Sequence, residues 1–165
     1  MNTDENQRQG VDTQRSSGHK NEDSAPLAEL TRRIIGAAME VSNTLGCGFL
    51  EKVYENALVV ELRRCGMKVS QQVPIHIVYK NQAVGEYVAD LVVEDAVLVE
   101  TKATEDDNPV FTAKTLNYLK ATRLHVGLVV NFGQPRLQWR RLILADTHRR
   151  GYLEDIQKDS RDEHR

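Results

Sequence analysis

Residues 90–102 read Asp-Leu-Val-Val-Glu-Asp-Ala-Val-Leu-Val-Glu-Thr-Lys, and the rest of the chain is organised around them. Two runs rich in valine and leucine flank the polar break Glu94-Asp95-Ala96, whose length and composition are typical of a hairpin tip. Side chains alternate across a strand, so Glu100 and Lys102 share one face. In a hairpin symmetric about its tip, Asp90 lies opposite Glu100. The stretch therefore predicts two acids and a lysine clustered on a largely apolar sheet.

The composition is that of a globular protein with one domain of ordinary size. The chain has 165 residues, 40% hydrophobic and 28% charged, which is enough to bury a core. No apolar run reaches the roughly 20 residues needed to span a bilayer, so no membrane association is expected. The net charge of −2 neither supports nor excludes a phosphate-bearing substrate.

The first 26 residues and the two cysteines bear on the cellular setting. Residues 1–26 contain no apolar stretch typical of a signal peptide. Cys47 and Cys65 lack metal-binding spacing, which argues against a disulfide framework or a zinc site. A reducing, cytoplasmic location is therefore expected.

Before the hairpin, the pattern predicts two helices and a run of strands. Apolar residues recur at intervals of three and four over residues 27–45, and a second helix is expected from Leu50 to Cys65. Strands are expected at 67–73, 74–80 and 83–93, with Pro74 at a strand edge or bulge.

After the hairpin partner at residues 97–103, the pattern predicts a helix and two further strands. The helix is expected at 110–122, a buried strand at 125–132 and one more possible strand at 140–145. This order indicates an α/β or α+β fold with a mixed sheet flanked by helices, in which 110–122 is a crossover.

Three segments are expected along the chain. Residues 1–26 form a polar tail that cannot bury enough surface to fold and is predicted to be disordered. Residues 27–145 form the globular domain, and residues 146–165 form a charged C-terminal tail.

The acids and the lysine of the hairpin suggest phosphodiester chemistry. An aspartate and a glutamate on adjacent strands can share a hard divalent cation, and a lysine beside them can position a water or stabilise developing negative charge. The alternative is an ordinary surface ion pair, because Glu and Lys two residues apart on a strand are common. The context favours function, since Glu100 and Lys102 end the apolar run 97–99, where a charge is costly unless it is engaged.

Two motifs carry a resemblance to known families. Asp90, followed ten residues later by Glu100-Thr101-Lys102, resembles the PD-(D/E)XK nuclease superfamily, although Ala89 replaces its proline. Residues 48–54, Gly-Phe-Leu-Glu-Lys-Val-Tyr, match the signature of the GxxExxY protein family. Residues 87–90, 116–120 and 127–133 are similar to that family too, so the resemblance covers about residues 27–145.

The resemblance implies a restriction-endonuclease-like core of αβββαβ order and a metal-dependent nuclease acting on nucleic acid, with DNA favoured over RNA. It implies that Asp90 and Glu100 bind Mg²⁺, with Mn²⁺ as a second choice, and that Lys102 assists the nucleophilic water. Glu51 is then an additional catalytic acid and metal ligand from the second helix. Tyr54 either bonds Glu51 or a phosphate, or is a buried core residue.

One position departs from the resemblance. The related families carry a glutamine four residues before Tyr118, whereas this chain has Lys114. A lysine there can contact a phosphate, or it can pair with an acid and compete with the metal. The alternative function is therefore a catalytically inactive nucleic-acid-binding or protein-interaction module on the same fold. A homodimer is left open, because double-strand cleavage usually pairs two sites.

Overall fold

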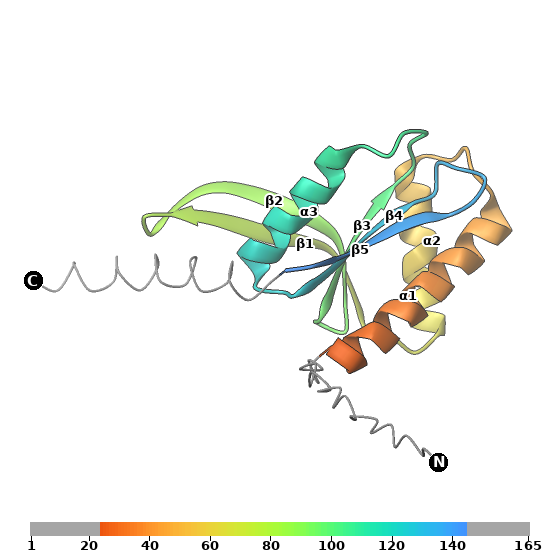
Figure 1. Ribbon diagram of the computed structural model, residues 1–165, viewed down its shortest axis with the longest axis horizontal. Coiled ribbons are helices and arrows are strands. Elements are labelled where there is room, and N and C mark those ends of the chain that lie inside the picture. Colours follow the sequence, from red (N-terminus) through yellow and green to blue (C-terminus); the bar gives the residue numbers. More distant parts are fainter. Residues whose placement is uncertain (1–23, 145–165) are drawn as a thin grey trace, which may run out of the picture.

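A mixed five-stranded sheet in the order β1-β2-β3-β4-β5 runs through the centre of the molecule (Figure 1). The computed structural model describes residues 24–144, so the predicted C-terminal tail and all but the last three residues of the predicted N-terminal tail lie outside it. The strands are β1 Val69–Tyr79, β2 Gln82–Val93, β3 Val97–Lys102, β4 Val126–Asn131 and β5 Gln138–Ile143.

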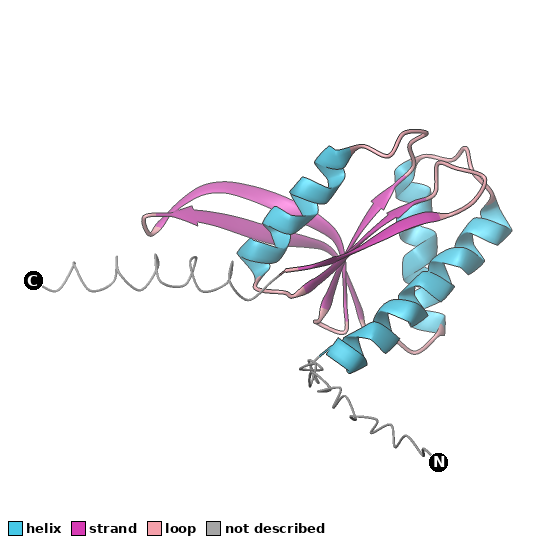
Figure 2. Cartoon of the chain, viewed as in Figure 1, coloured by secondary structure: helices cyan, strands magenta, loops and turns pink. Residues whose placement is uncertain are grey.

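Three helices cover the two faces of the sheet (Figure 2). The helices are α1 Ser24–Leu45, α2 Glu51–Arg64 and α3 Pro109–Thr122. Helices α1 and α2 pack on one face, in a core that contains Ile34, Leu58 and Leu128. Helix α3 packs on the other face, in a core that contains Leu98 and Leu119. None of the helices in residues 24–144 is long and apolar enough to cross a membrane.

The strand connections agree with the predicted α+β fold. Strands β1, β2 and β3 form an antiparallel meander, β3 and β4 are parallel, and β4 and β5 are antiparallel. Parallel neighbours need a crossover connection, and α3 provides it, as expected.

Two strand predictions are corrected by the structure. The strands expected at 67–73 and 74–80 are the single strand β1, in which Pro74 pairs with Val88. Proline is tolerated there because β1 is an edge strand, where one side needs no backbone donor. The last strand, expected at 140–145, is Gln138–Ile143 and begins two residues earlier.

The hairpin of β2 and β3 has the predicted register. Leu91 pairs with Val99 and Val93 with Val97, which is the symmetric arrangement about Asp95. The tip residues Glu94 and Asp95 have φ angles of 52° and 53°, the left-handed conformation that tight hairpin turns require. The next positions in this register are Asp90 and Glu100.

The pairing between β2 and β3 ends at Asp90. The paired residues run only from Leu91 to Val93 on β2, whereas β2 remains paired with β1 as far as Gln82. In Figure 1 the two outer strands β1 and β2 extend away from the body as a curved arm beside α3. The polar residues of the hairpin therefore lie in the angle where the arm leaves the sheet.

The ends of β3 and β4 are tied together just beyond this angle. Asn131 accepts a hydrogen bond from the backbone N–H of Thr104 at 3.1 Å and donates to its carbonyl at 2.9 Å. Gly133 lies against the same backbone, and a Cβ atom at this position would come within 2.3 Å of the Thr104 nitrogen and oxygen. Gly133 therefore permits a close approach of two backbone segments.

We predict that Gly133→Ala lowers the free energy of unfolding, measured by urea denaturation, by about 1–3 kcal/mol, because the backbone of Thr104 must shift. The matched control is Gly36→Ala, in the exposed middle of α1, where an added Cβ meets no atom within 4 Å. That change is expected to raise stability by about 0.5–1 kcal/mol, because alanine is the better helix former. Equal effects of the two substitutions would contradict the close approach.

Candidate active site

Four predicted site residues meet where β2 leaves β3. Asp90 comes from β2, Glu100 and Lys102 from the end of β3, and Glu51 is the first residue of α2. The Lys102 ammonium nitrogen lies 3.3 Å from Glu51 Oε1, 3.7 Å from Glu100 Oε2 and 4.0 Å from Asp90 Oδ2. One ammonium group thus faces three carboxylates that belong to three different elements.

Asp90 is fixed by the strand it leaves. Its Oδ2 accepts hydrogen bonds from the backbone N–H of Thr101 at 2.8 Å and from the Thr101 hydroxyl at 2.9 Å. The carboxylate thereby satisfies a backbone donor of β3 after strand pairing has stopped. Both of these bonds, and the 4.0 Å ion pair with Lys102, are made by Oδ2.

Glu100 is a buried carboxylate in a charged environment. Its side chain is 1% exposed, and Oε1 accepts a 3.4 Å bond from the Asp90 backbone N–H. Burial raises the pKa of Glu100 above its ordinary value, and the neighbouring Asp90 carboxylate raises it further, against the opposing effect of the nearby lysines. Positive charge close to Glu100 is what offsets this cost.

The turn before α2 places Glu51. Gly46 and Gly48 have φ angles of 69° and 111°, which side-chain-bearing residues rarely adopt. The Tyr54 hydroxyl donates to the Gly46 carbonyl at 2.7 Å and accepts from the Phe49 N–H at 3.1 Å. This turn starts α2 so that its first side chain reaches Lys102.

Tyr54 therefore supports the site from within the core. Its side chain is fully buried and its ring stacks on Phe132, with centroids 4.8 Å apart and planes 6° from parallel. Of the two roles considered for Tyr54, the structure agrees with the buried one, because the hydroxyl bonds the turn and not Glu51.

Helix α3 brings Lys114 and Tyr118 to the site. The Lys114 ammonium nitrogen lies 3.3 Å from Glu100 Oε2 and 5.1 Å from the centre of the Tyr118 ring. Burial alone would lower the pKa of Lys114, but attraction to Glu100 and contact with Tyr118 outweigh it, so the pKa is raised. Burial raises the pKa of Tyr118, and its hydrogen bond with Lys114 acts in the opposite direction.

Sequence reasoning missed Glu55, one turn after Glu51 on α2. Its side chain is 4% exposed and Oε1 accepts bonds from Lys52 at 2.8 Å, Gln71 at 2.7 Å and Gln72 at 2.8 Å. Gln72 has a φ of 54° and interrupts the β1–β2 ladder opposite Asp90. The spacing of Glu51 and Glu55, which puts both on one helix face, was the signal available in the sequence.

The donor chemistry of the site fits a hard divalent cation held by two carboxylates. Asp90 and Glu100 place carboxylate oxygens on neighbouring strands, and Mg²⁺ is commonly bound by one or two carboxylates together with waters and substrate phosphates. Within residues 24–144 no three acidic, histidine or cysteine side chains are already arranged as a metal site. Glu51 contacts Lys102 instead, so its role as a third ligand stays a prediction.

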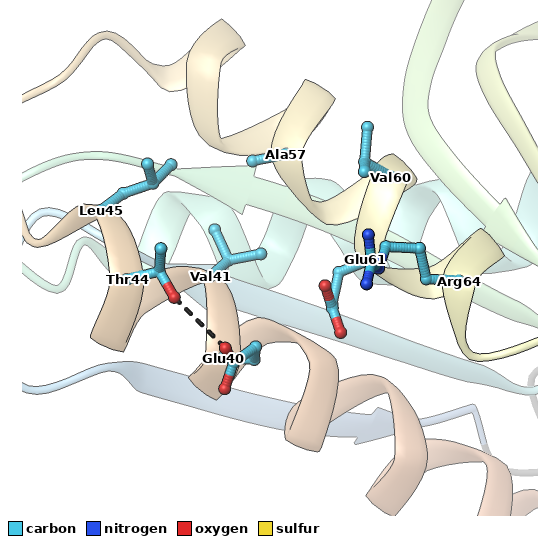
Figure 3. Close-up of a pocket in the computed structure, with 8 residues that line it drawn as sticks. All are labelled: Glu40, Val41, Thr44, Leu45, Ala57, Val60, Glu61 and Arg64. Atoms are coloured by element: carbon cyan, nitrogen blue, oxygen red, sulfur yellow. Dashed lines mark hydrogen bonds between the residues drawn. The ribbon is translucent and has the colours of Figure 1, made fainter.

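A separate groove of about 530 Å³ lies between α1 and α2 (Figure 3). Its apolar lining is Val41, Leu45, Ala57 and Val60, and its polar lining is Glu40, Thr44, Glu61 and Arg64. A helix turns by about 100° per residue, so the groove side of α2 faces away from Glu51. None of the residues proposed for catalysis lines this groove.

Comparison with known proteins places the chain in a family. Residues 28–142 match the model of the PD-(D/E)XK nuclease superfamily, and the chain belongs to this superfamily. No curated protein matches the sequence.

Two solved structures are similar in fold at low sequence identity. The crystal structure of SSO0001 is 15% identical with a TM-score of 0.44, and the match covers 65% of this chain and 58% of that one. An alkaline exonuclease (LHK-Exo) from Laribacter hongkongensis is 12% identical with a TM-score of 0.41, over 76% of this chain and 85% of that one. The chain thus spans little more than half the length of SSO0001.

We predict that Glu55→Ala lowers the free energy of unfolding by about 1–3 kcal/mol near neutral pH, because three hydrogen bonds to this buried carboxylate are lost. Although burial acts to raise it, the pKa of Glu55 is held below its ordinary value of 4.5 by these three bonds. The stabilisation is therefore complete above pH 4.5 and is lost as the pH falls through the lower folded-state pKa.

Urea denaturation as a function of pH measures this effect. The control is Glu29→Ala on α1, whose carboxylate pairs with Arg32 while 56% exposed. That substitution is expected to change stability by less than about 1 kcal/mol. A Glu55→Ala effect that did not shrink in acid would show that the charge of Glu55 is not what stabilises the cluster.

Proposed function

We propose that the protein is a metal-dependent nuclease that hydrolyses phosphodiester bonds, with DNA as the favoured substrate. The observation that carries this proposal is the convergence of Glu51, Asp90 and Glu100 on the Lys102 ammonium at the end of β3. Superfamily membership supports the same reaction class. The four side chains come from three elements, and a surface ion pair would not require that arrangement.

Each side chain has a role that its surroundings support. Asp90 and Glu100 hold Mg²⁺ or Mn²⁺, which when bound lowers the pKa of a water and offsets charge on the phosphate. Lys102 orients the attacking water and stabilises negative charge on the phosphate oxygens, because its buried ammonium is fixed beside both acids. Glu51 keeps that ammonium in place and is the additional acid of the site.

We also propose that the chain is a GxxExxY-type member of the superfamily. The three fixed residues of the signature have separate structural tasks that support this assignment. Gly48 allows the left-handed turn, Glu51 reaches the site, and Tyr54 bonds the turn from the core. Residues 27–145 are the proposed nuclease domain.

A cellular location and an oligomeric state are part of the same proposal. Cys47 and Cys65 are free and exposed thiols, which suits a reducing cytoplasm. Pairing of two chains as a homodimer is proposed only for cleavage of both strands of a duplex.

A non-catalytic binding module is the second candidate, and one contact favours it. Lys114 pairs with Glu100 at 3.3 Å, so the carboxylate proposed to bind metal already has a cationic partner. A protein of this kind would bind nucleic acid or another protein without binding metal at Asp90. Metal titration separates the two candidates directly.

We predict that the wild-type protein binds Mg²⁺ or Mn²⁺ in isothermal titration calorimetry and that Asp90→Asn abolishes this binding. Asparagine keeps an oxygen that can accept the Thr101 bonds but removes the charge, so the fold should persist. The control Asp95→Asn makes the same change at the hairpin tip, where Asp95 is 66% exposed and pairs with Lys68. Absence of metal binding by the folded wild type would reject the enzyme and favour the binding module.

We predict that Lys102→Ala reduces cleavage by about 100-fold or more, because a fixed positive charge beside the reacting phosphate is lost. Cleavage is measured on linear, supercoiled and branched DNA and on RNA, which also identifies the substrate. Lys68→Ala, which removes an exposed lysine that precedes β1 and pairs with Asp95 at the hairpin tip, is expected to leave the rate unchanged. Cleavage that survives Lys102→Ala at full rate would place the activity at another site.

A further inference from the structure

Two lysines contact the same oxygen of Glu100. Lys102 Nζ lies 3.7 Å and Lys114 Nζ 3.3 Å from Oε2, while Oε1 accepts the Asp90 backbone N–H. Both oxygens of the carboxylate therefore have partners within the protein. A cation that binds Glu100 through Oε2 would compete with these two lysines.

The two lysines differ in how firmly they are held. Lys102 is 9% exposed, touches three carboxylates and donates a 2.6 Å bond to the Thr101 carbonyl. Lys114 is 39% exposed and contacts one carboxylate and the Tyr118 side chain, through its ring face and a hydrogen bond. Lys114 is therefore the lysine that can leave Glu100 at the lower cost, because more of its side chain already faces solvent.

The charges of the cluster favour replacement of the Lys114 ammonium by a metal ion at Glu100. The cluster contains three carboxylates and two ammonium groups, so its net charge is −1 when all five groups are ionised. A divalent cation at Asp90 and Glu100 would reverse this balance, and it would repel an ammonium that touches the same oxygen. Departure of Lys114 into solvent relieves that repulsion while Lys102 stays fixed beside Thr101.

We propose that Lys114 is a tethered counter-ion that competes with the metal for Glu100, so that metal binding displaces its ammonium. This inference rests on the proposed metal-dependent function of the same site. In the metal-free protein Lys114 compensates the buried Glu100 carboxylate. The metal then binds more weakly than it would to the same acids without Lys114, and the site fills only when divalent cation is abundant enough to win this competition.

Calorimetric titration of the full chain with MgCl₂ and MnCl₂ tests the competition without any cleavage assay. Lys114→Gln removes the ammonium and keeps a polar side chain of similar reach. Loss of a partly exposed ion pair predicts metal binding about fivefold tighter than in the wild type. Lys114→Arg keeps the charge and is expected to bind metal no more tightly than the wild type.

The matched control is Lys120→Gln, which makes the same change on the same helix six residues away, close to the C-terminus of α3. It is expected to leave metal affinity unchanged. This control separates the specific contact with Glu100 from the general effect of removing one positive charge from the protein.

Thermal unfolding gives a second readout. Metal-free Lys114→Gln should melt below the wild type, because buried Glu100 loses a counter-ion, and saturating metal should raise its Tm more than it raises that of the wild type. A purely structural lysine would lower the Tm with and without metal by the same amount and leave metal affinity unchanged.

The outcomes are distinguishable. If the wild type binds metal through Asp90 and Lys114→Gln binds it no more tightly, the competition is rejected and the proposed function stands. If Lys120→Gln tightens binding as much as Lys114→Gln, the effect is one of net charge and the inference is also rejected. If neither the wild type nor Lys114→Gln binds metal while both are folded, the inference and the proposed function fail together.

Discussion

The candidate site depends on the ion pairs of the Lys102 ammonium, because its positive charge offsets the repulsion between three neighbouring carboxylates. Glu100 is almost completely buried, and its burial together with the neighbouring Asp90 carboxylate raises its pKa, while Glu51 reaches the same lysine from another element. A buried charge of this kind persists only when a partner is fixed nearby. The bond from Lys102 to the Thr101 carbonyl and the apolar strand around it provide that fixed position.

The backbone of β2 and β3 also helps to position the polar cluster. Strand β2 pairs with β3 over three residues and then turns away, and Asp90 takes the Thr101 N–H that pairing would otherwise satisfy. The strand separation and the polar cluster are therefore one feature, since the side chain that marks the end of the ladder also faces the lysine. On the other side of β2, Glu55 accepts hydrogen bonds from Gln71 and Gln72 of β1.

Most of the fold was predictable because it follows local patterns. Alternation placed Glu100 and Lys102 on one face, the hairpin tip set the register that brings Asp90 opposite Glu100, and a continuous apolar run indicated the buried strand β4. Pro74 misled the strand boundaries, because its tolerance depends on β1 being an edge. The meeting of Glu51 with Lys102 could not be predicted from local pattern, because it depends on how α2 packs across the sheet; only the resemblance suggested it.

Helices on both faces of the sheet contribute side chains to the candidate site. Glu51 is carried by α2, which packs with β2 and β3 in one hydrophobic core, whereas Lys114 is carried by α3, which packs in the other. Strand β3 contributes to both cores, because Leu98 packs in the core with α3 whereas Val97 and Val99 pack in the core with α2, and the Lys102 ammonium lies 5.5 Å from the centre of the Phe111 ring of α3. The candidate site thus lies between the two cores, with Glu51 supplied from one and Lys114 from the other, and sequence change at position 114 of α3 alters the charge beside Glu100.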